Sequence, residues 1–339
     1  MLALRIVLAF VFAMFAFGAK AETLVVAAPF GEFPALAAQM LDGATAGLQG
    51  EWVVKTIDAG CTDEKAKSVG DLILVEKPDA VLGLPCIESL TVALHALGPI
   101  GVPIITIASR ADAPSKLAVK NKWRLYRIGP RENEEAEKVA ALIVDAWKNV
   151  PFALLDDGTI FARDTAETIR NTAEVAGLKP VLADGFQPQL ESQQKLIDRL
   201  KASGASHVFI AGDRANIAQI ASEAAGSGLV FAGPETLRAA DLDFSLQQGV
   251  LMAARDMPLS TEASAKIAAA RAAEFAGAEG YTADAYVAAE IAMALKANGD
   301  QRSFQTAAGA LTIAPDGFIE PVNFALFAYD GTAFQKVSP

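Results

Sequence analysis

Short runs of β-branched and other apolar residues alternate along the chain with longer amphipathic stretches that are rich in alanine. In the first part, this pattern predicts strands at 24–28, 52–57, 80–82 and 103–107, and helices at 34–48, 63–76 and 88–97. Strands that alternate with helices in this way form a parallel sheet with helices on both faces. The first part is therefore predicted to be an α/β lobe.

The same rhythm restarts after a predicted strand at 124–127 and a connection at Gly129-Pro130. Strands are expected at 152–155, 180–184, 207–211, 230–232 and 250–253, and helices at 132–148, 163–175, 189–201, 215–225, 261–275 and 283–297. A hairpin around Asp330-Gly331 is predicted to join 324–329 to 332–336. The pattern indicates two α/β lobes joined by several crossings, with any ligand at the carboxyl ends of the strands.

The first residues of the chain have the three parts of a secretory signal. One positive charge precedes an apolar core at 6–18, and Ala19-Lys20-Ala21 offers small residues for cleavage. The apolar core is short for a spanning helix, which needs about 20 apolar residues. We expect residues 1–21 to be a signal peptide cleaved after Ala21, with export to the periplasm. An uncleaved N-terminal anchor is the alternative.

Composition narrows the class of protein further. The chain has 339 residues, 52% of them hydrophobic, which is enough for two cores. Its formal net charge of −11 becomes −13 once Arg5 and Lys20 leave with the signal. Such an acidic protein is a poor partner for nucleic acid or anionic lipid.

Cysteine and histidine are scarce. Cys61 and Cys86 are the only cysteines, and in an exported chain they are predicted to form one disulfide. His95 and His207 lie far apart, so no zinc-type cluster is expected. The chain has no G-x-S-x-G, G-x-x-x-x-G-K-[ST] or G-x-G-x-x-G motif. We therefore predict no enzyme activity, no cofactor and no metal.

Several short motifs occur in a specific order. They are Asp58-Ala-Gly-Cys61 with Ala66, Lys77-Pro-Asp79-Ala-Val81-Leu-Gly83-Leu-Pro-Cys86, Asp42-Gly43-Ala44, Gly233-Pro234-Glu235, and YTADAYVAAEIAMAL at 281–295. Together they resemble the type I periplasmic binding proteins of the branched-chain amino acid and amide group, which serve ABC transporters. The resemblance covers nearly all of the chain after the signal.

The resemblance implies a clam-like molecule of two doubly wound lobes joined by three hinge crossings. We expect residues 22–126 plus 256–316 in the N-terminal lobe and residues 127–255 plus 317–339 in the C-terminal lobe. A small amino acid-like or amide-like solute would close the lobes, and the closed monomer would dock on an ABC permease. A ligand-sensing receptor of the same fold is the alternative function, and an exported enzyme is a remoter one.

The resemblance also carries site positions onto the N-terminal lobe, with departures. Ile87 follows Cys86 at the cleft edge, where relatives have a serine that touches the ligand carboxylate. Ala108 matches the family's next strand end, Ser109 follows it, and Arg110 takes the position of a threonine. An arginine there could bind a carboxylate bidentately. The alternative is a solvated arginine paired with Asp112.

The remaining site positions follow from the same resemblance. Phe161 takes the position of a family tyrosine. Asp213 takes the position of a family aromatic residue, where it would accept a hydrogen bond from an ammonium or amide group. The alternative role for Asp213 is to cap the next helix. Glu235 keeps the family acid and is the expected ammonium partner, although it could be a solvated turn carboxylate. Phe30 or Phe33 would supply an apolar wall. The hypothesis is that Arg110 binds a carboxylate, that Glu235 and Asp213 bind an amine, and that the ligand differs from leucine.

Overall fold

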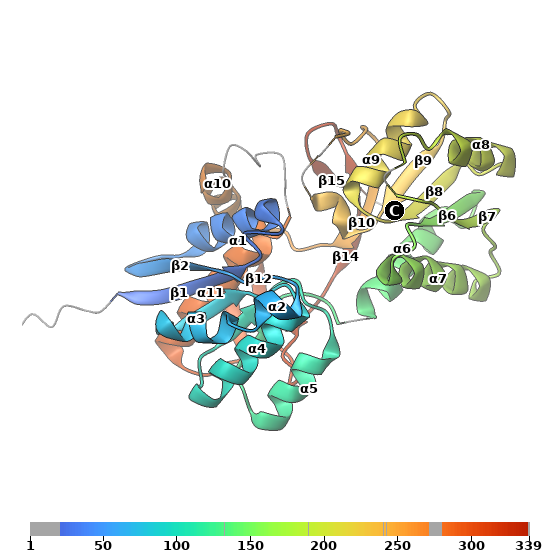
Figure 1. The fold of residues 1–339 in the computed structure, drawn as a ribbon. Coiled ribbons are helices and arrows are strands. Elements are labelled where there is room, and N and C mark those ends of the chain that lie inside the picture. Colours follow the sequence, from blue (N-terminus) through green and yellow to red (C-terminus); the bar gives the residue numbers. More distant parts are fainter. Residues whose placement is uncertain are drawn as a thin grey trace, which may run out of the picture.

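The computed structural model describes residues 21–131, 133–188, 190–239, 241, 243–270 and 280–337. Two large β-sheets lie apart, each with its own helices, and thin connections join them (Figure 1). The α/β class and the two-lobe arrangement are as predicted. Residues 1–20 of the expected signal, and parts of the expected helices at 132–148, 189–201 and 261–275, lie outside the described residues.

The first lobe contains a five-stranded parallel sheet in the order β2-β1-β3-β4-β5. Its strands are β1 (Glu22–Ala28), β2 (Trp52–Asp58), β3 (Ala80–Gly83), β4 (Ile104–Thr106) and β5 (Leu125–Arg127). Its helices are α1 (Pro34–Gly47), α2 (Asp63–Ala66), α3 (Val69–Val75), α4 (Ile87–Leu97), η1 (Gly98–Ile100), α5 (Asp112–Asn121), α10 (Thr261–Ala270) and α11 (Thr282–Asn298). The helix predicted at 63–76 is thus two short helices, and α5 was not predicted.

Alternation along the strands gives this sheet two buried faces. Leu24 and Val26 pack with α1 and α11, whereas Val25 and Val81 face the core formed with α3 and α4. Helices α1 and α11 approach closely because α1 has a glycine at the contact. A Cβ on Gly43 would lie 2.1 Å from the Thr282 carbonyl oxygen. This packing fixes the first turn of α11.

The second lobe contains a seven-stranded sheet in the order β15-β14-β10-β9-β8-β6-β7. Its strands are β6 (Phe152–Asp156), β7 (Leu182–Gly185), β8 (His207–Ala211), β9 (Val230–Gly233), β10 (Leu251–Arg255), β14 (Phe324–Tyr329) and β15 (Phe334–Val337). Its helices are α6 (Glu134–Trp147), α7 (Ile160–Val175), α8 (Gln194–Ser203), α9 (Arg214–Glu223) and the 3₁₀ turn η2 (Glu235–Arg238). The antiparallel pairing of β14 with β15 confirms the predicted hairpin.

A small antiparallel sheet that was not predicted completes the first lobe. It consists of β11 (Ser303–Thr306), β12 (Gly309–Ile313) and β13 (Ile319–Glu320). Leu311, Ile313 and Ile319 join the core that contains β1 and α11. Since β13 pairs with β12, we propose that the last crossing follows Glu320 rather than residue 316.

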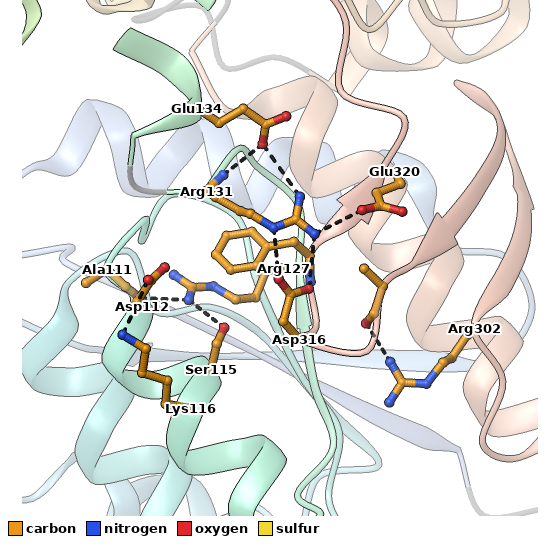
Figure 2. A network of polar contacts seen from close by, with 12 residues as sticks. Ala111, Asp112, Ser115, Lys116, Arg127, Arg131, Glu134, Arg302, Asp316 and Glu320 are labelled. Atoms are coloured by element: carbon orange, nitrogen blue, oxygen red, sulfur yellow. Dashed lines mark hydrogen bonds and ion pairs between the residues drawn. The ribbon is translucent and has the colours of Figure 1, made fainter. Parts of the chain in front are cut away.

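Arginines link two connections between the lobes, the one after β5 and the one near β13 (Figure 2). These are the first and third crossings. Arg131 binds Asp316 through two hydrogen bonds of 2.8 and 3.2 Å, and Glu320 through one of 2.9 Å. The guanidinium of Arg127 lies 4.2 Å from the ring centroid of Phe318. These contacts hold side by side the two segments through which the chain leaves the first lobe.

No helix in the described ranges combines the length and apolar character that a membrane span requires. In the same part of the chain, His, Cys, Asp and Glu side chains form no group that could hold a metal ion.

Candidate ligand-binding site

The predicted disulfide between Cys61 and Cys86 is confirmed, with Cα atoms 5.1 Å apart. It joins the loop before α2 to the residue that caps α4, so the first residue of α4, Ile87, has a fixed position. Two further contacts brace this corner. Ser89 donates a hydrogen bond to the Gly60 carbonyl, and the Cys61 amide donates one of 2.7 Å to Glu32. The Cys61 amide, helped by Lys65, lowers the pKa of Glu32.

The loop after β4 carries Ala108, Ser109 and Arg110, and it is anchored by hydrogen bonds from Arg127. Arg127 is 1% exposed and donates hydrogen bonds to the Ser109 carbonyl, to the Ala111 carbonyl (2.7 Å) and to Ser115 Oγ (2.8 Å). Figure 2 shows Arg127 directed toward Ala111 and Ser115. Because both neighbours of Arg110 are anchored, its side chain leaves the loop in a defined direction.

Arg110 reaches across to the second lobe and contacts two carboxylates. Its Nε lies 2.6 Å from Glu135 Oε2 on α6, and its Nη2 lies 3.5 Å from Glu235 Oε2 on η2. The Arg110–Glu135 contact is an ion pair without hydrogen-bond geometry. Asp112, the alternative partner expected for Arg110, forms an ion pair of 3.5 Å with Lys116. The structure therefore brings together Arg110 and Glu235, two of the predicted site residues.

Glu235 also belongs to a wider network at the second crossing. Arg255, at the end of β10, binds Glu235 through Nε (3.1 Å) and Asp284 of α11 through Nη2 (2.5 Å). Arg238 approaches Glu235 to 3.5 Å from the same 3₁₀ turn. Glu235 is therefore no solvated turn carboxylate, because its side chain is only 10% exposed.

The position of η2 is fixed from the strand beside it. Thr236 Oγ1 donates a 2.7 Å hydrogen bond to the Gly212 carbonyl, next to Asp213. Arg214 is buried, forms a 2.7 Å ion pair with Asp241 and donates a hydrogen bond to the Leu237 carbonyl. Glu235 and Asp213 therefore lie on neighbouring, mutually braced turns.

Burial and neighbouring charge act against each other on these groups. Burial raises the pKa of Glu135 even though Arg110 acts in the opposite direction. Burial likewise disfavours ionised Glu235, but Arg255, Arg238 and Arg110 outweigh it and lower the pKa of Glu235. Arg110 keeps a raised pKa because nearby carboxylates outweigh its desolvation. Of Glu135 and Glu235, Glu135 is the one held closer to protonation.

The other predicted site residues lie near strand ends and are not among the ion-paired residues described above. Phe161 is in the first turn of α7 and is 40% exposed, while Ile87 is 37% exposed on the other lobe. Phe30 and Ala108 pack partly against the first core. Asp213 caps α9 by position, but its side chain makes no capping hydrogen bond.

Two acidic groups meet on the second lobe beside these residues. Desolvation, with the neighbouring carboxylate of Asp157, raises the pKa of Asp213. The Asp157 side chain is engaged by Thr159, whose amide and hydroxyl donate to Oδ1 at 2.9 and 2.7 Å. Asp213 is the more exposed residue of this pair.

A cavity of about 250 Å³ lies on the hinge side of the network. Its lining includes Glu235, Arg255 and Thr282, with Met257 and Ile267 as apolar walls. Of the predicted site residues only Glu235 lines it. Sequence reasoning missed Glu135, Arg255 and Asp284. Glu135 and Asp284 lie within predicted helices, whereas Arg255 lies two residues beyond the predicted strand at 250–253 and ends the observed strand β10.

The family described as periplasmic binding protein matches residues 53–338. The chain belongs to the periplasmic binding protein family. More narrowly, it is a type I periplasmic binding protein of the branched-chain amino acid group. The expected family and fold are thereby confirmed.

The matched relatives have low sequence identity to this chain, but the matches cover most of both proteins. Leu/Ile/Val-binding protein homolog 3 of Brucella melitensis biotype 1 is 25% identical over 305 residues, covering 84% of this chain and 82% of that protein. LivJ of Streptococcus pneumoniae, a branched-chain amino acid transporter substrate binding protein in complex with isoleucine, has a TM-score of 0.70 at 15% identity. That match covers 94% of this chain and 100% of LivJ.

A second kind of structural neighbour holds an aromatic acid. A solute binding protein of an ABC transporter from Rhodopseudomonas palustris BisB5, in complex with 3,4-dihydroxy benzoic acid, has a TM-score of 0.70 at 15% identity. The match covers 93% of this periplasmic binding protein and 95% of that chain. At 15% identity, both solved structures are evidence for the fold alone.

Proposed function

We propose that this protein is the substrate-binding component of an ABC uptake transporter and binds a small amino acid-like or amide-like solute between its lobes. One observation carries the proposal. Arg110 of the first lobe and Glu235 of the second lobe face each other at 3.5 Å, a cation and an anion on opposite sides of the gap. A ligand with a carboxylate and an amine can enter between them and satisfy both.

The mechanism follows from the placement of these groups. The ligand carboxylate would bind Arg110 Nη2, and its amine would bind Glu235 Oε2, with Asp213 as a further acceptor. Ile87 and Phe161, which are partly exposed on opposite lobes, would cover the apolar part of the ligand. A ligand that bridges the lobes stabilises the closed form over the open one, because only the closed form offers both contacts.

The remaining parts of the proposal rest on the family. We further propose export through a signal peptide cleaved after Ala21, a monomeric state, docking on permease subunits and a lack of catalysis, as expected for a member of this family. N-terminal sequencing of the exported protein tests the cleavage site. A first residue other than Glu22 contradicts it.

The ligand itself is best found by mass spectrometry of small molecules released from purified, denatured protein. Calorimetry with that ligand then tests the pocket through Arg110→Ala and Glu235→Gln, each expected to weaken binding at least about tenfold, or about 1.4 kcal/mol. Arg199→Ala and Glu191→Gln, at exposed positions in the second lobe, are matched controls that should bind normally. Unchanged affinity in both test variants contradicts the proposed pocket.

A further inference from the structure

We propose that Glu135 determines the net charge of the ligand that the cleft accepts, by neutralising Arg110, so that charge-balanced ligands are selected over carboxylate monoanions. The inference rests on the proposed function, because it concerns the same cleft. It assigns Glu135 a role in specificity.

The position of Glu135 is unusual for a carboxylate. It lies in the first turn of α6 on the same helical face as Val139 and Ile143, which belong to the second lobe's core. Its side chain is 4% exposed, and Arg110 Nε is 2.6 Å away. A buried charge without a partner is strongly unfavourable, so Glu135 and Arg110 stabilise each other as a pair. Arg110 is therefore already neutralised before any ligand arrives.

The charges in the network alternate. In spatial order they run Glu135, Arg110, Glu235, Arg255 and Asp284, with contacts of 2.6, 3.5, 3.1 and 2.5 Å between neighbours. Arg238 adds a further positive charge beside Glu235. Three arginines thus balance three carboxylates. The Arg110–Glu235 contact is the longest in this chain of contacts and spans the two lobes, so it is the place where a ligand can enter.

Ligand charge then decides the outcome. A zwitterion placed between Arg110 and Glu235 continues the alternation and leaves the network neutral. A monoanion in the same place adds one uncompensated negative charge to a buried cluster, which is unfavourable at short range in a poorly solvated site. Removing the charge of Glu135 would leave one excess positive charge, and a monoanion would balance it.

Protonation of Glu135 should have the same effect as a neutral substitution. The charged groups that face Glu135 are Arg110, Glu235 and Arg255, with Tyr281 nearby. Burial raises the pKa of Glu135, which places its titration nearer to neutral pH than that of a solvated glutamate. Monoanion binding to the unaltered protein should therefore strengthen as the pH falls.

The test compares Glu135→Gln with Glu137→Gln, which removes the same charge from an exposed position in the first turn of α6. The probes are two pairs that differ only by the amino group: L-leucine with 4-methylpentanoate, and L-phenylalanine with 3-phenylpropanoate. Calorimetry gives the affinity ratio within each pair. Glu135→Gln should shift this ratio toward the monoanion by about tenfold or more, and Glu137→Gln should leave it unchanged.

A pH series on the unaltered protein provides a second arm that does not depend on folding of a variant. Between about pH 8 and about pH 6 the carboxylates of the two monoanion probes remain ionised, and monoanion affinity should rise as protons are added. An unshifted ratio in Glu135→Gln, with leucine or phenylalanine still bound, overturns the role of Glu135 and leaves the proposed function standing. Failure of all four probes to bind any variant, together with the release of no amino acid-like or amide-like solute from denatured protein, overturns both proposals.

Discussion

Arg127→Met should loosen the ligand-contacting loop of the first lobe without touching the ligand. The substitution keeps an apolar stem of similar length but removes the guanidinium. The hydrogen bonds to the Ser109 carbonyl, the Ala111 carbonyl and Ser115 Oγ are lost, together with the contact to the Phe318 ring. The loop that carries Arg110 then lacks the anchors on either side of it.

The magnitude follows from burial. Arg127 is 1% exposed, so its acceptors do not regain water easily once it is gone. Hydrogen bonds from charged donors contribute about 1.5–3 kcal/mol each, and the contributions within one group are not additive. The cation–π contact adds about 1 kcal/mol. Allowing for partial compensation by the methionine, we expect the free energy of unfolding to fall by about 3–5 kcal/mol.

Urea unfolding followed by tryptophan fluorescence measures this loss, since Trp52 and Trp123 both pack in the first lobe. Calorimetry with the released ligand should show about tenfold weaker binding. Arg199→Met removes a half-exposed arginine whose partner is Asp184 at 2.8 Å, and it should cost less than about 1 kcal/mol. Equal urea midpoints and equal affinities for Arg127→Met and the unaltered protein would refute the anchoring role.

Three other substitutions have defined outcomes. Cys61→Ser opens a loop of 25 residues, which should lower the stability by about 3 kcal/mol on the chain-entropy account and reduce the melting temperature. Burial opposes ionisation of Asp79, but hydrogen bonds from Lys296 and the Thr23 amide outweigh it and lower its pKa. Its stabilisation is complete above the unfolded pKa of about 3.9 and is lost as pH falls, so Asp79→Asn should flatten the acid side of a melting-temperature profile. Gly43→Ala puts a methyl group against the Thr282 carbonyl and should lower the free energy of unfolding by about 1–3 kcal/mol, which is seen as a lower urea midpoint.

Each of these has a matched comparison. Reduction of the unaltered protein should reproduce the Cys61→Ser melting temperature, and a lack of change on reduction would contradict the stabilising role of the disulfide. Asp71→Asn removes an exposed carboxylate from α3, and its acid profile should keep its slope. Thr45→Ala changes an exposed position of α1 and should leave the urea midpoint nearly unchanged. A Gly43→Ala protein as stable as Thr45→Ala would show that α1 and α11 can move apart freely.

The sequence pattern predicted the two lobes because their strands are buried on both faces and their helices are amphipathic. It also placed Arg110 and Glu235 at strand ends, where parallel sheets present their loops. The small sheet from β11 to β13 was missed because its strands are short and mostly alternate without a continuous apolar run. Such strands are stabilised by packing of Leu311 and Ile319 on the core, which local pattern does not reveal.

The site was only half predictable for a related reason. Which charged groups pair depends on contacts between segments far apart in the chain, such as Arg110 with Glu135 and Arg255 with Asp284. A local signal did exist for Glu135, since it precedes Val139 and Ile143 on the apolar face of a helix. A carboxylate at such a position is expected to have a buried partner, but the pattern does not name the partner.

The pairing changes what Glu235 does in this protein. An isolated acid at that position would bind only the ligand. Here Glu235 also binds Arg255 of the second crossing and Arg110 of the first lobe. A ligand that takes up one oxygen of Glu235 therefore alters the contacts that hold the lobes at rest. Lobe closure is favoured only by the difference between the ligand's contacts and those it replaces. Because the replaced contact at 3.5 Å is the longest of the alternating series, even a small zwitterion can gain more than it displaces.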